Sequence, residues 1–222
     1  MHDQTEGRRI ALVGNAPEIG DWSGRVDTAD RVVRINDAHG LNGPTGARTT
    51  DLFLVNSGGS MRERLDDPSF TDRQAFRDAE RLWLPIDPGH VDLFDPPATE
   101  AERAGAAAED WTDEARERFE AAGKRVELLP ADLFARACEA IGTRMRVGMA
   151  PPSTGYLAAL ALLEGPEDGR LECFGFGFEG WEAHNWSGEQ RWFERRHAEG
   201  RLTLHPLDPS EKMPDRETME VT

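Results

Sequence analysis

Lysine is almost absent from this sequence: of its 26 basic residues, only Lys124 and Lys212 are lysines. The basic residues are also outnumbered, because 42 aspartates and glutamates give a formal net charge of −16. Such an acidic surface repels nucleic-acid backbones and anionic lipid headgroups. We therefore expect no general nucleic-acid or membrane binding. A phosphate-bearing ligand would need a pocket whose local potential opposes that of the surface.

Long apolar runs are absent too. No segment approaches the run of about 20 apolar residues that spans a membrane, and residues 1–9 lack the apolar core of a signal peptide. We expect a cytoplasmic protein without a transmembrane segment. Cysteine is scarce: Cys138 and Cys173 lie in apolar segments, which is typical of reduced thiols in a protein core.

What remains is an alternation of short β-branched runs with longer helical stretches. Over 222 residues, this pattern predicts one α/β domain (1–205) with three α/β/α layers around a mostly parallel, Rossmann-like sheet. The Pro- and charge-rich stretch 206–222 is expected to be a loosely ordered tail. The expected strands are 9–13, 31–35, 51–55, 81–86, 125–129, 171–177 and 202–205. The expected helices are 71–80, 131–141, a stretch through 163, and 189–198.

Residues 87–124 are expected to leave the sheet as a helical insert. The segment opens with a loop rich in Pro, Gly and Asp and continues as an Ala-, Glu- and Arg-rich region over 99–122, with a break near Trp111. Two interpretations stay open: a lid on the acceptor side of a site, or a solvated helical excursion.

Polar residues follow the expected strands, at the edge where parallel α/β sheets bind their ligands. Gly14 and Asn15 end the first strand, and Asn36 ends the second. Arg48 stands with two threonines before the third strand, either as an anion contact or as part of a surface turn. The glycine spacing does not match the dinucleotide-binding fingerprint, which argues against NAD.

An apolar helix is expected to begin after Ser153, Thr154 and Gly155. The free N–H groups at the start of such a helix suit a phosphate or a carboxylate. Capping of the helix alone is the other interpretation.

The glycines of Gly175-Phe176-Gly177 leave room for a flat ring beside an aromatic side chain. His184 and Glu189 follow, and an imidazole oriented by a carboxylate suits proton abstraction from a sugar hydroxyl. Such a pair is also common in purely structural roles.

In this order, the segments resemble the motifs of the eukaryotic-type sialyltransferase family (glycosyltransferase family 29) in reduced form. Residues 11–51 are similar to the long sialylmotif, 152–177 to the short sialylmotif, and 184–189 to the very short motif H-x4-E. Residues 195–204 are similar to the helix and strand that follow. The resemblance covers about half of the chain and implies a variant of the GT-A-type fold with a Rossmann-like sheet.

The resemblance implies an inverting, metal-independent transfer of an acidic sugar (sialic acid or a relative such as Kdo) from a CMP-activated donor to a glycan or glycolipid hydroxyl. No cofactor is implied, and the sequence contains no Asp-x-Asp motif. The region between the motifs, which would select the acceptor, is short. The alternative is therefore a CMP- or nucleotide-binding module without transferase activity.

The same resemblance assigns roles to the candidate residues. The general base would be His184, in a loop braced by Glu189. The donor pocket would comprise Asn15 and Asn36 at the phosphate and ribose, Ser153, Thr154 and Gly155 at the phosphate or sugar carboxylate, and Gly175, Phe176 and Gly177 along the cytosine.

The chain departs from the family in several features. It shows no membrane anchor, and the segment that resembles the long motif has no cysteine to pair with Cys173. A separate histidine–aromatic motif of the family is missing or fused into the very short motif. His184 is therefore either the base or a phosphate-side histidine, and its spacing from Glu189 favours the base.

Overall fold

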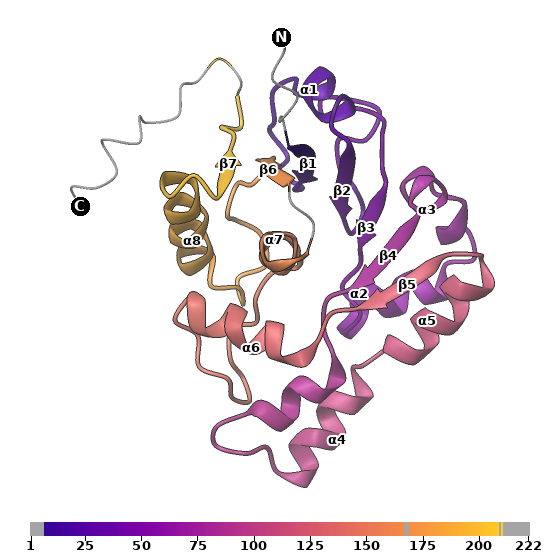
Figure 1. The fold of residues 1–222 in the computed structure, drawn as a ribbon. Coiled ribbons are helices and arrows are strands. Elements are labelled where there is room, and N and C mark those ends of the chain that lie inside the picture. Colours follow the sequence, from indigo (N-terminus) through magenta and orange to yellow (C-terminus); the bar gives the residue numbers. More distant parts are fainter. Residues whose placement is uncertain (1–6, 167–168, 209, 211–222) are drawn as a thin grey trace.

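A computed structural model of the chain describes residues 7–166, 169–208 and 210. In these residues, one sheet has the strand order β5-β4-β3-β2-β1-β6-β7 (Figure 1). Every pairing is parallel, and all seven expected strands are present. The strands are β1 (Arg8–Val13), β2 (Arg31–Ile35), β3 (Asp51–Phe53), β4 (Arg81–Leu84), β5 (Arg125–Leu128), β6 (Gly169–Phe174) and β7 (Leu202–Leu204).

The order of the strands reverses beside β1. The chain adds β2 to β5 on one side of β1 and then returns to place β6 on the other side. At the carboxyl ends, Val13 of β1 is in register with Arg34 of β2 and Phe174 of β6. Such a reversal leaves a crevice outside the strand ends, which is the usual ligand position in open α/β sheets.

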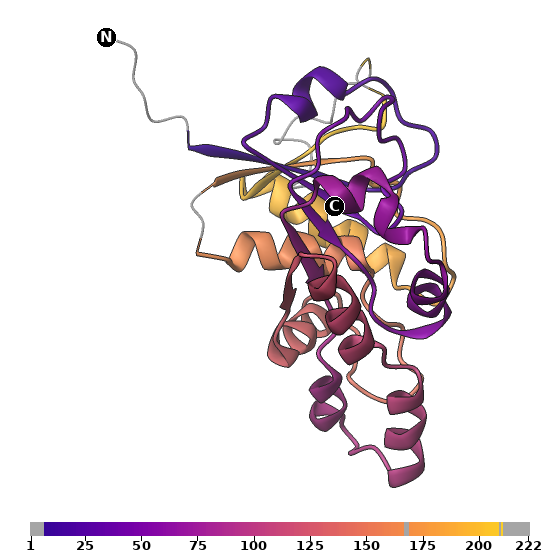
Figure 2. The same cartoon turned by 90° about the vertical axis from the view of Figure 1, so that its right-hand side faces the viewer.

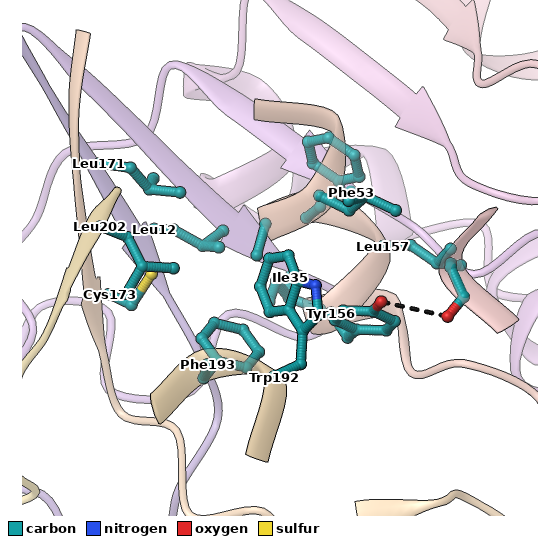
Figure 3. Close-up of a cluster of buried hydrophobic side chains, with 14 of the residues drawn as sticks. Leu12, Ile35, Phe53, Tyr156, Leu157, Leu171, Cys173, Trp192, Phe193 and Leu202 are labelled. Carbon is teal, nitrogen blue, oxygen red and sulfur yellow. Dashed lines mark hydrogen bonds between the residues drawn. The ribbon is translucent and has the colours of Figure 1, made fainter. Parts of the chain in front are cut away.

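Helices cover both faces of the sheet, so the expected three-layer α/β/α architecture is confirmed. One face packs against α6 (Ala131–Ala140), α7 (Thr154–Glu164) and α8 (Trp186–Ala198). Figure 3 shows this core, in which the rings of Tyr156 of α7 and Trp192 of α8 meet edge to face, with their centroids 4.9 Å apart. Full burial of a large apolar side chain contributes about 1.5–3 kcal/mol, so these contacts fix the position of α7.

The other face packs against α1 (Ser23–Asp27), α2 (Gly58–Asp66), α3 (Gln74–Asp78) and α5 (Thr112–Ala121). The expected helix 71–80 is instead the 3-10 turn η1 (Phe70–Asp72) followed by α3, because Arg73 is extended (φ −63°, ψ 139°). The sequence did not predict α1, which has only five residues, or α2, which begins at a glycine pair typical of a turn.

The insert combines a buried helix with an exposed one. It contains the 3-10 segment η2 (Pro88–Leu93), α4 (Glu100–Ala108) and α5, with the predicted break before α5. Phe119 of α5 is fully buried in the core that packs between the sheet and α2, α3 and α5. In contrast, α4 buries no residue and lies away from the sheet (Figures 1 and 2). The excursion interpretation therefore fits α4, and α5 belongs to the helical layer.

The remaining expectations concern the cysteines, membrane helices and the tail. Cys138 and Cys173 are buried and free, as predicted, and burial raises the pKa of the Cys138 thiol to about 12. In the described ranges, no helix is long and apolar enough to cross a membrane. The predicted tail 206–222 lies mostly outside the described residues.

Candidate functional site

A cavity of about 240 Å³ opens at the carboxyl edge of the sheet, where β1 and β6 meet. Its walls are the segments after β1, β2 and β6, the start of α7 and the loop before α8. All the predicted site residues except Arg48 line it: Asn15, Asn36, Ser153, Thr154, Gly155, Gly175, Phe176, Gly177, His184 and Glu189.

Two glycines allow the ends of β1 and β6 to approach each other at this cavity. The N–H of Gly14 donates to Phe174 O at 2.8 Å, and the N–H of Ala16 donates to Gly175 O at 3.0 Å. A Cβ at Gly14 would lie 2.3 Å from Gly175 O. Gly175 also has a φ of +70°, in the left-handed region that favours glycine. Glycine is thus required at position 14 by the close approach of the backbone and at position 175 by the left-handed conformation.

Phe176 forms an aromatic wall of the cavity. Its ring packs against Phe193 of α8 at 4.7 Å. A Cβ at Gly155 would lie 3.1 Å from both the Phe176 ring and the Ile35 side chain, so glycine lets the start of α7 rest on this ring. Phe176 thus lines the cavity, and the flat-ring site beside it stays a prediction.

The start of α7 presents open backbone donors to the cavity. The first four N–H groups of a helix segment have no intrahelical acceptor. Here Ser153 N–H donates to Glu189, and Tyr156 N–H donates to Ser153 Oγ at 3.2 Å. The N–H groups of Thr154 and Gly155 have no partner among the described residues, and both residues line the cavity. A helix N-terminus of this kind suits an anion.

Glu189 holds the residue that caps α7. Its two carboxylate oxygens accept from Ser153 N at 2.7 Å and from Ser153 Oγ at 2.6 Å. The side chain is buried and has no ion-pair partner among the described residues, and burial raises its pKa to about 7. The expectation that Glu189 orients the imidazole of His184 is corrected, because both oxygens are engaged by Ser153.

His184 is oriented by a backbone carbonyl instead. Its Nδ1 lies 2.7 Å from Pro151 O, and a carbonyl can only accept, so Nδ1 carries the proton. Nε2 then keeps its lone pair and has no partner in the described part of the chain. Burial lowers the pKa of His184, although the bond to Pro151 opposes this, so the ring is neutral at pH 7. Trp181 and Trp186 each meet the ring edge to face at 4.9 Å.

The two predicted asparagines differ in how many of their polar atoms remain open. Asn15 donates to Ile35 O at 3.0 Å and accepts from His39 N at 2.9 Å, so it ties the ends of β1 and β2 together. Asn36 (φ +50°) accepts from Val55 N at 2.9 Å, and its Nδ2 finds no partner within the described ranges. Asn36 is therefore the more available hydrogen-bond donor.

Arg48 lies outside the cavity. Its guanidinium donates to Asp27 O at 2.8 Å and to Ala29 O, at the end of α1. Its own carbonyl accepts from Arg34 Nε at 2.9 Å. We therefore correct the expectation of an anion contact at Arg48, since it stabilises a turn.

Charge at the cavity comes from acidic side chains. Glu179 and Glu189 line it, and no arginine or lysine does among the described residues. The local potential that a phosphate needs is thus supplied by the α7 N–H groups. The described residues also contain no group of three His, Cys, Asp or Glu side chains placed to hold a metal ion.

Sequence reasoning did not assign the Pro151 carbonyl, Phe178 or Glu179 to the site. A backbone carbonyl has no sequence signature. Phe178 and Glu179 directly follow the Gly175-Phe176-Gly177 segment, and that adjacency was the available signal.

No protein-family model matches the chain. It is 26% identical over 214 residues to the urease operon 23 kDa accessory protein of Rhizobium meliloti (strain 1021), covering 92% of this chain and 96% of that protein.

Among solved structures, the chain is similar to a mammalian sialyltransferase, with a TM-score of 0.53 and 15% identity over 90% of this chain and 69% of that one. A mammalian sialyltransferase in complex with Gal-beta-1-3GalNAc-ortho-nitrophenol gives a TM-score of 0.50 at 15% identity, with the same coverage of both chains. At this identity the similarity concerns the fold alone. This chain has a sialyltransferase-like α/β fold.

Proposed function

We propose that this protein is a glycosyltransferase that takes an acidic sugar from a CMP-activated donor and transfers it to a glycan or glycolipid hydroxyl. One observation carries the proposal: a single cavity joins the open N–H groups of Thr154 and Gly155 to a neutral histidine with a free Nε2. The first feature suits a departing phosphate, and the second suits a general base.

In this proposal, the donor lies across the junction of β1, β6 and α7. Its phosphate accepts from the N–H groups of Thr154 and Gly155, and the Asn36 amide donates to the phosphate or ribose. The cytosine lies along the Phe176 ring and beside Gly177. A Cβ built at Gly177 would make only ordinary van der Waals contacts with the protein.

The reaction is a single displacement that inverts the sugar carbon. Nε2 of His184 removes the proton of the acceptor hydroxyl as its oxygen attacks that carbon. The bond from the carbon to the phosphate oxygen breaks, and CMP leaves with the electron pair. The helix N-terminus stabilises the charge that develops on the phosphate, in a site partly shielded from water. No metal ion takes part in the proposed reaction.

The size of the cavity favours a second candidate, a nucleotide-binding module without transfer activity. At about 240 Å³, the cavity is smaller than typical small-molecule sites, which have about 300–1,000 Å³. Donor and acceptor cannot both be enclosed there, so the acceptor would lie at the rim, near the exposed Trp181. The name of the R. meliloti relative gives an operon and no reaction, so it does not decide between the candidates.

Calorimetry with CMP, UMP, GMP and ADP, followed by assays of CMP release from CMP-sialic acid and CMP-Kdo, tests the proposal. We expect preferential CMP binding and donor-dependent CMP release. The His184→Ala variant should lower turnover by about 10² to 10⁴, the usual contribution of a general base, with CMP affinity little changed.

His90 provides a matched control, because its Nδ1 also bonds a backbone carbonyl (Asp87 O, 2.8 Å) but it lies outside the cavity. His90→Ala should therefore retain turnover. Equal loss of CMP binding and turnover in His184→Ala would place His184 on the phosphate side. Binding without CMP release would favour the module, and the absence of CMP binding would rule out both candidates.

A further inference from the structure

The cavity wall contains a buried carboxylate that no cation of the described residues neutralises. Glu189 is 1% exposed, and within the described ranges its carboxylate accepts only from the backbone N–H and the hydroxyl of Ser153. This arrangement is unusual, because buried carboxylates are normally paired with a cation or become protonated.

Among the residues that the structure describes, the titratable groups around Glu189 supply no positive charge at neutral pH. Tyr156 on α7 donates its hydroxyl to Ala137 O, burial lowers the pKa of His184 and keeps its ring neutral, and Glu179 is acidic. Arg196, two turns further along α8, pairs with Glu199 at 2.6 Å. A second anion in the cavity would therefore meet an uncompensated negative charge.

The open N–H groups of α7 place such an anion next to Glu189. Thr154 and Gly155 directly follow Ser153, the residue that Glu189 binds through both oxygens. Two negative charges in one poorly solvated site cannot both persist, and the cheaper outcome is protonation of one of them. A phosphodiester stays ionised at any pH near neutrality, so the carboxylate is the group that can change.

We infer that the cavity binds its anionic ligand together with one proton, and that Glu189 is the residue that takes up this proton. The anion's identity as a CMP-activated sugar rests on the proposed function; the proton uptake does not. Burial already raises the pKa of Glu189 to about 7, so little further perturbation is needed near neutral pH.

Protonation also changes what Ser153 offers to the ligand. With Glu189 ionised, the Ser153 hydroxyl donates to Glu189 at 2.6 Å and accepts from Tyr156 N. With Glu189 neutral, the acid O–H donates to Ser153 Oγ, which has a second lone pair to accept it. The hydroxyl proton of Ser153 is then released toward the cavity. The site gains a donor at the same step in which it loses a negative charge.

Calorimetry at pH 7.5 and 8.5, in buffers of different ionisation enthalpy, measures the uptake directly. The probe is the methyl ester of CMP, a phosphodiester with constant charge in this range. We expect uptake of close to one proton at pH 8.5, and an affinity that falls about tenfold per pH unit above the pKa of Glu189.

Glu189→Gln imitates the protonated carboxyl group. It should bind the ester without proton uptake, independently of pH, and more tightly than the wild type at pH 8.5. A gain of affinity cannot come from structural damage. His184→Gln is the matched control, because an anion could also raise the pKa of His184. Uptake should persist in His184→Gln.

Three results would overturn the inference: binding of the ester by the wild type without proton uptake, unchanged uptake in Glu189→Gln, or loss of uptake in His184→Gln. The first result is measured on the wild-type protein and does not depend on the folding of a variant. Sulfate, as a second probe, separates the two proposals. If sulfate binds with proton uptake and the ester does not bind, the proposed function fails and the inference stands. If neither probe binds, both fail.

Discussion

At the scale of single residues, the approach of β1 to β6 depends on the absence of a side chain at Gly14. The atom that a Cβ would meet, at 2.3 Å, is a backbone oxygen of Gly175. A backbone atom cannot rotate away as the end of a side chain can. One methyl group at this position must therefore separate the strand ends that form the cavity.

Gly14→Ala should lower the free energy of unfolding by about 1–3 kcal/mol, the usual cost of overpacking, and should abolish nucleotide binding. Urea denaturation and calorimetry with CMP measure the two effects. Gly177→Ala is the control for stability alone, because its Cβ would meet the nearest atom, Ala16 Cβ, at an ordinary 3.5 Å. Unchanged stability in Gly14→Ala would contradict the close approach.

Residue-level prediction placed Ser153 at a helix start and Phe176 after a strand, and both residues line the cavity. Their roles toward a ligand stay predictions. Arg48 shows why residue-level prediction failed elsewhere. Arginine before a strand suits an anion, but the carbonyls at the end of α1 are a competing partner that only the folded chain brings near. The same holds for His184, whose partner is the carbonyl of Pro151 rather than the expected carboxylate.

At the scale of secondary-structure elements, Glu172 of β6 connects three neighbours on the face opposite α7. Its buried carboxylate accepts from Arg25 of α1 at 2.6 Å, Arg9 of β1 at 3.4 Å and His205 after β7 at 3.1 Å. Burial alone would raise the pKa of Glu172. The hydrogen bonds from His205 and Arg25 and the positive charges of Arg25 and Arg9 outweigh it and bring the pKa to about 2.

Glu172→Gln should destabilise the protein by about 3–5 kcal/mol at pH 7, as expected when one member of a buried ion cluster is removed. Because the folded-state pKa is depressed, the stabilisation is present above the unfolded-state value near 4.5 and is lost as the pH falls toward 2. Denaturation at pH 7 and at pH 3 should show the wild-type advantage shrinking.

Glu127 on the edge strand β5 is the control for this experiment. Its side chain is 31% exposed and pairs with Arg125, which is 69% exposed. Surface pairs of this kind contribute about 0–1 kcal/mol, so Glu127→Gln should have little effect. An equal loss of stability in both variants would contradict the role of Glu172 as a connection between elements.

All seven strands could be predicted because their apolar runs are short and bounded by polar or turn residues. The helices of the second layer were harder to predict. The η1–α3 pair is divided by the extended Arg73, and Arg73 donates to both Asp37 and Asp67. The contact with Asp37 joins residues 36 positions apart along the chain, so local propensity does not contain it.

At the scale of the whole molecule, the charge of −16 is not offset by any cationic side chain at the cavity within the described residues. Sites that hold phosphate with arginine or lysine lose affinity as salt rises. Here the long-range field repels the ligand, and the N–H groups that attract it act at short range, where salt screens little.

CMP affinity should therefore increase, or at least not fall, when the ionic strength rises from about 0.02 M to about 0.2 M, because the Debye length shortens to below about 10 Å. Calorimetry with sodium chloride at fixed pH measures this trend, with uncharged cytidine as the control ligand. A steep loss of CMP affinity with salt would mean that cationic side chains reach the bound phosphate.

The position of β6 beside β1 also sets the order in which the protein acquires its cavity during synthesis. Strands β1 to β5 pair with neighbours that are close along the chain, whereas β6 pairs with β1, from which most of the chain separates it (Val13 with Phe174). Closing so long a loop is the entropically costly step and delays such contacts. A nascent chain whose β6 is still inside the ribosome has most of its sheet and no ligand site, so binding competence arrives with the last third of translation.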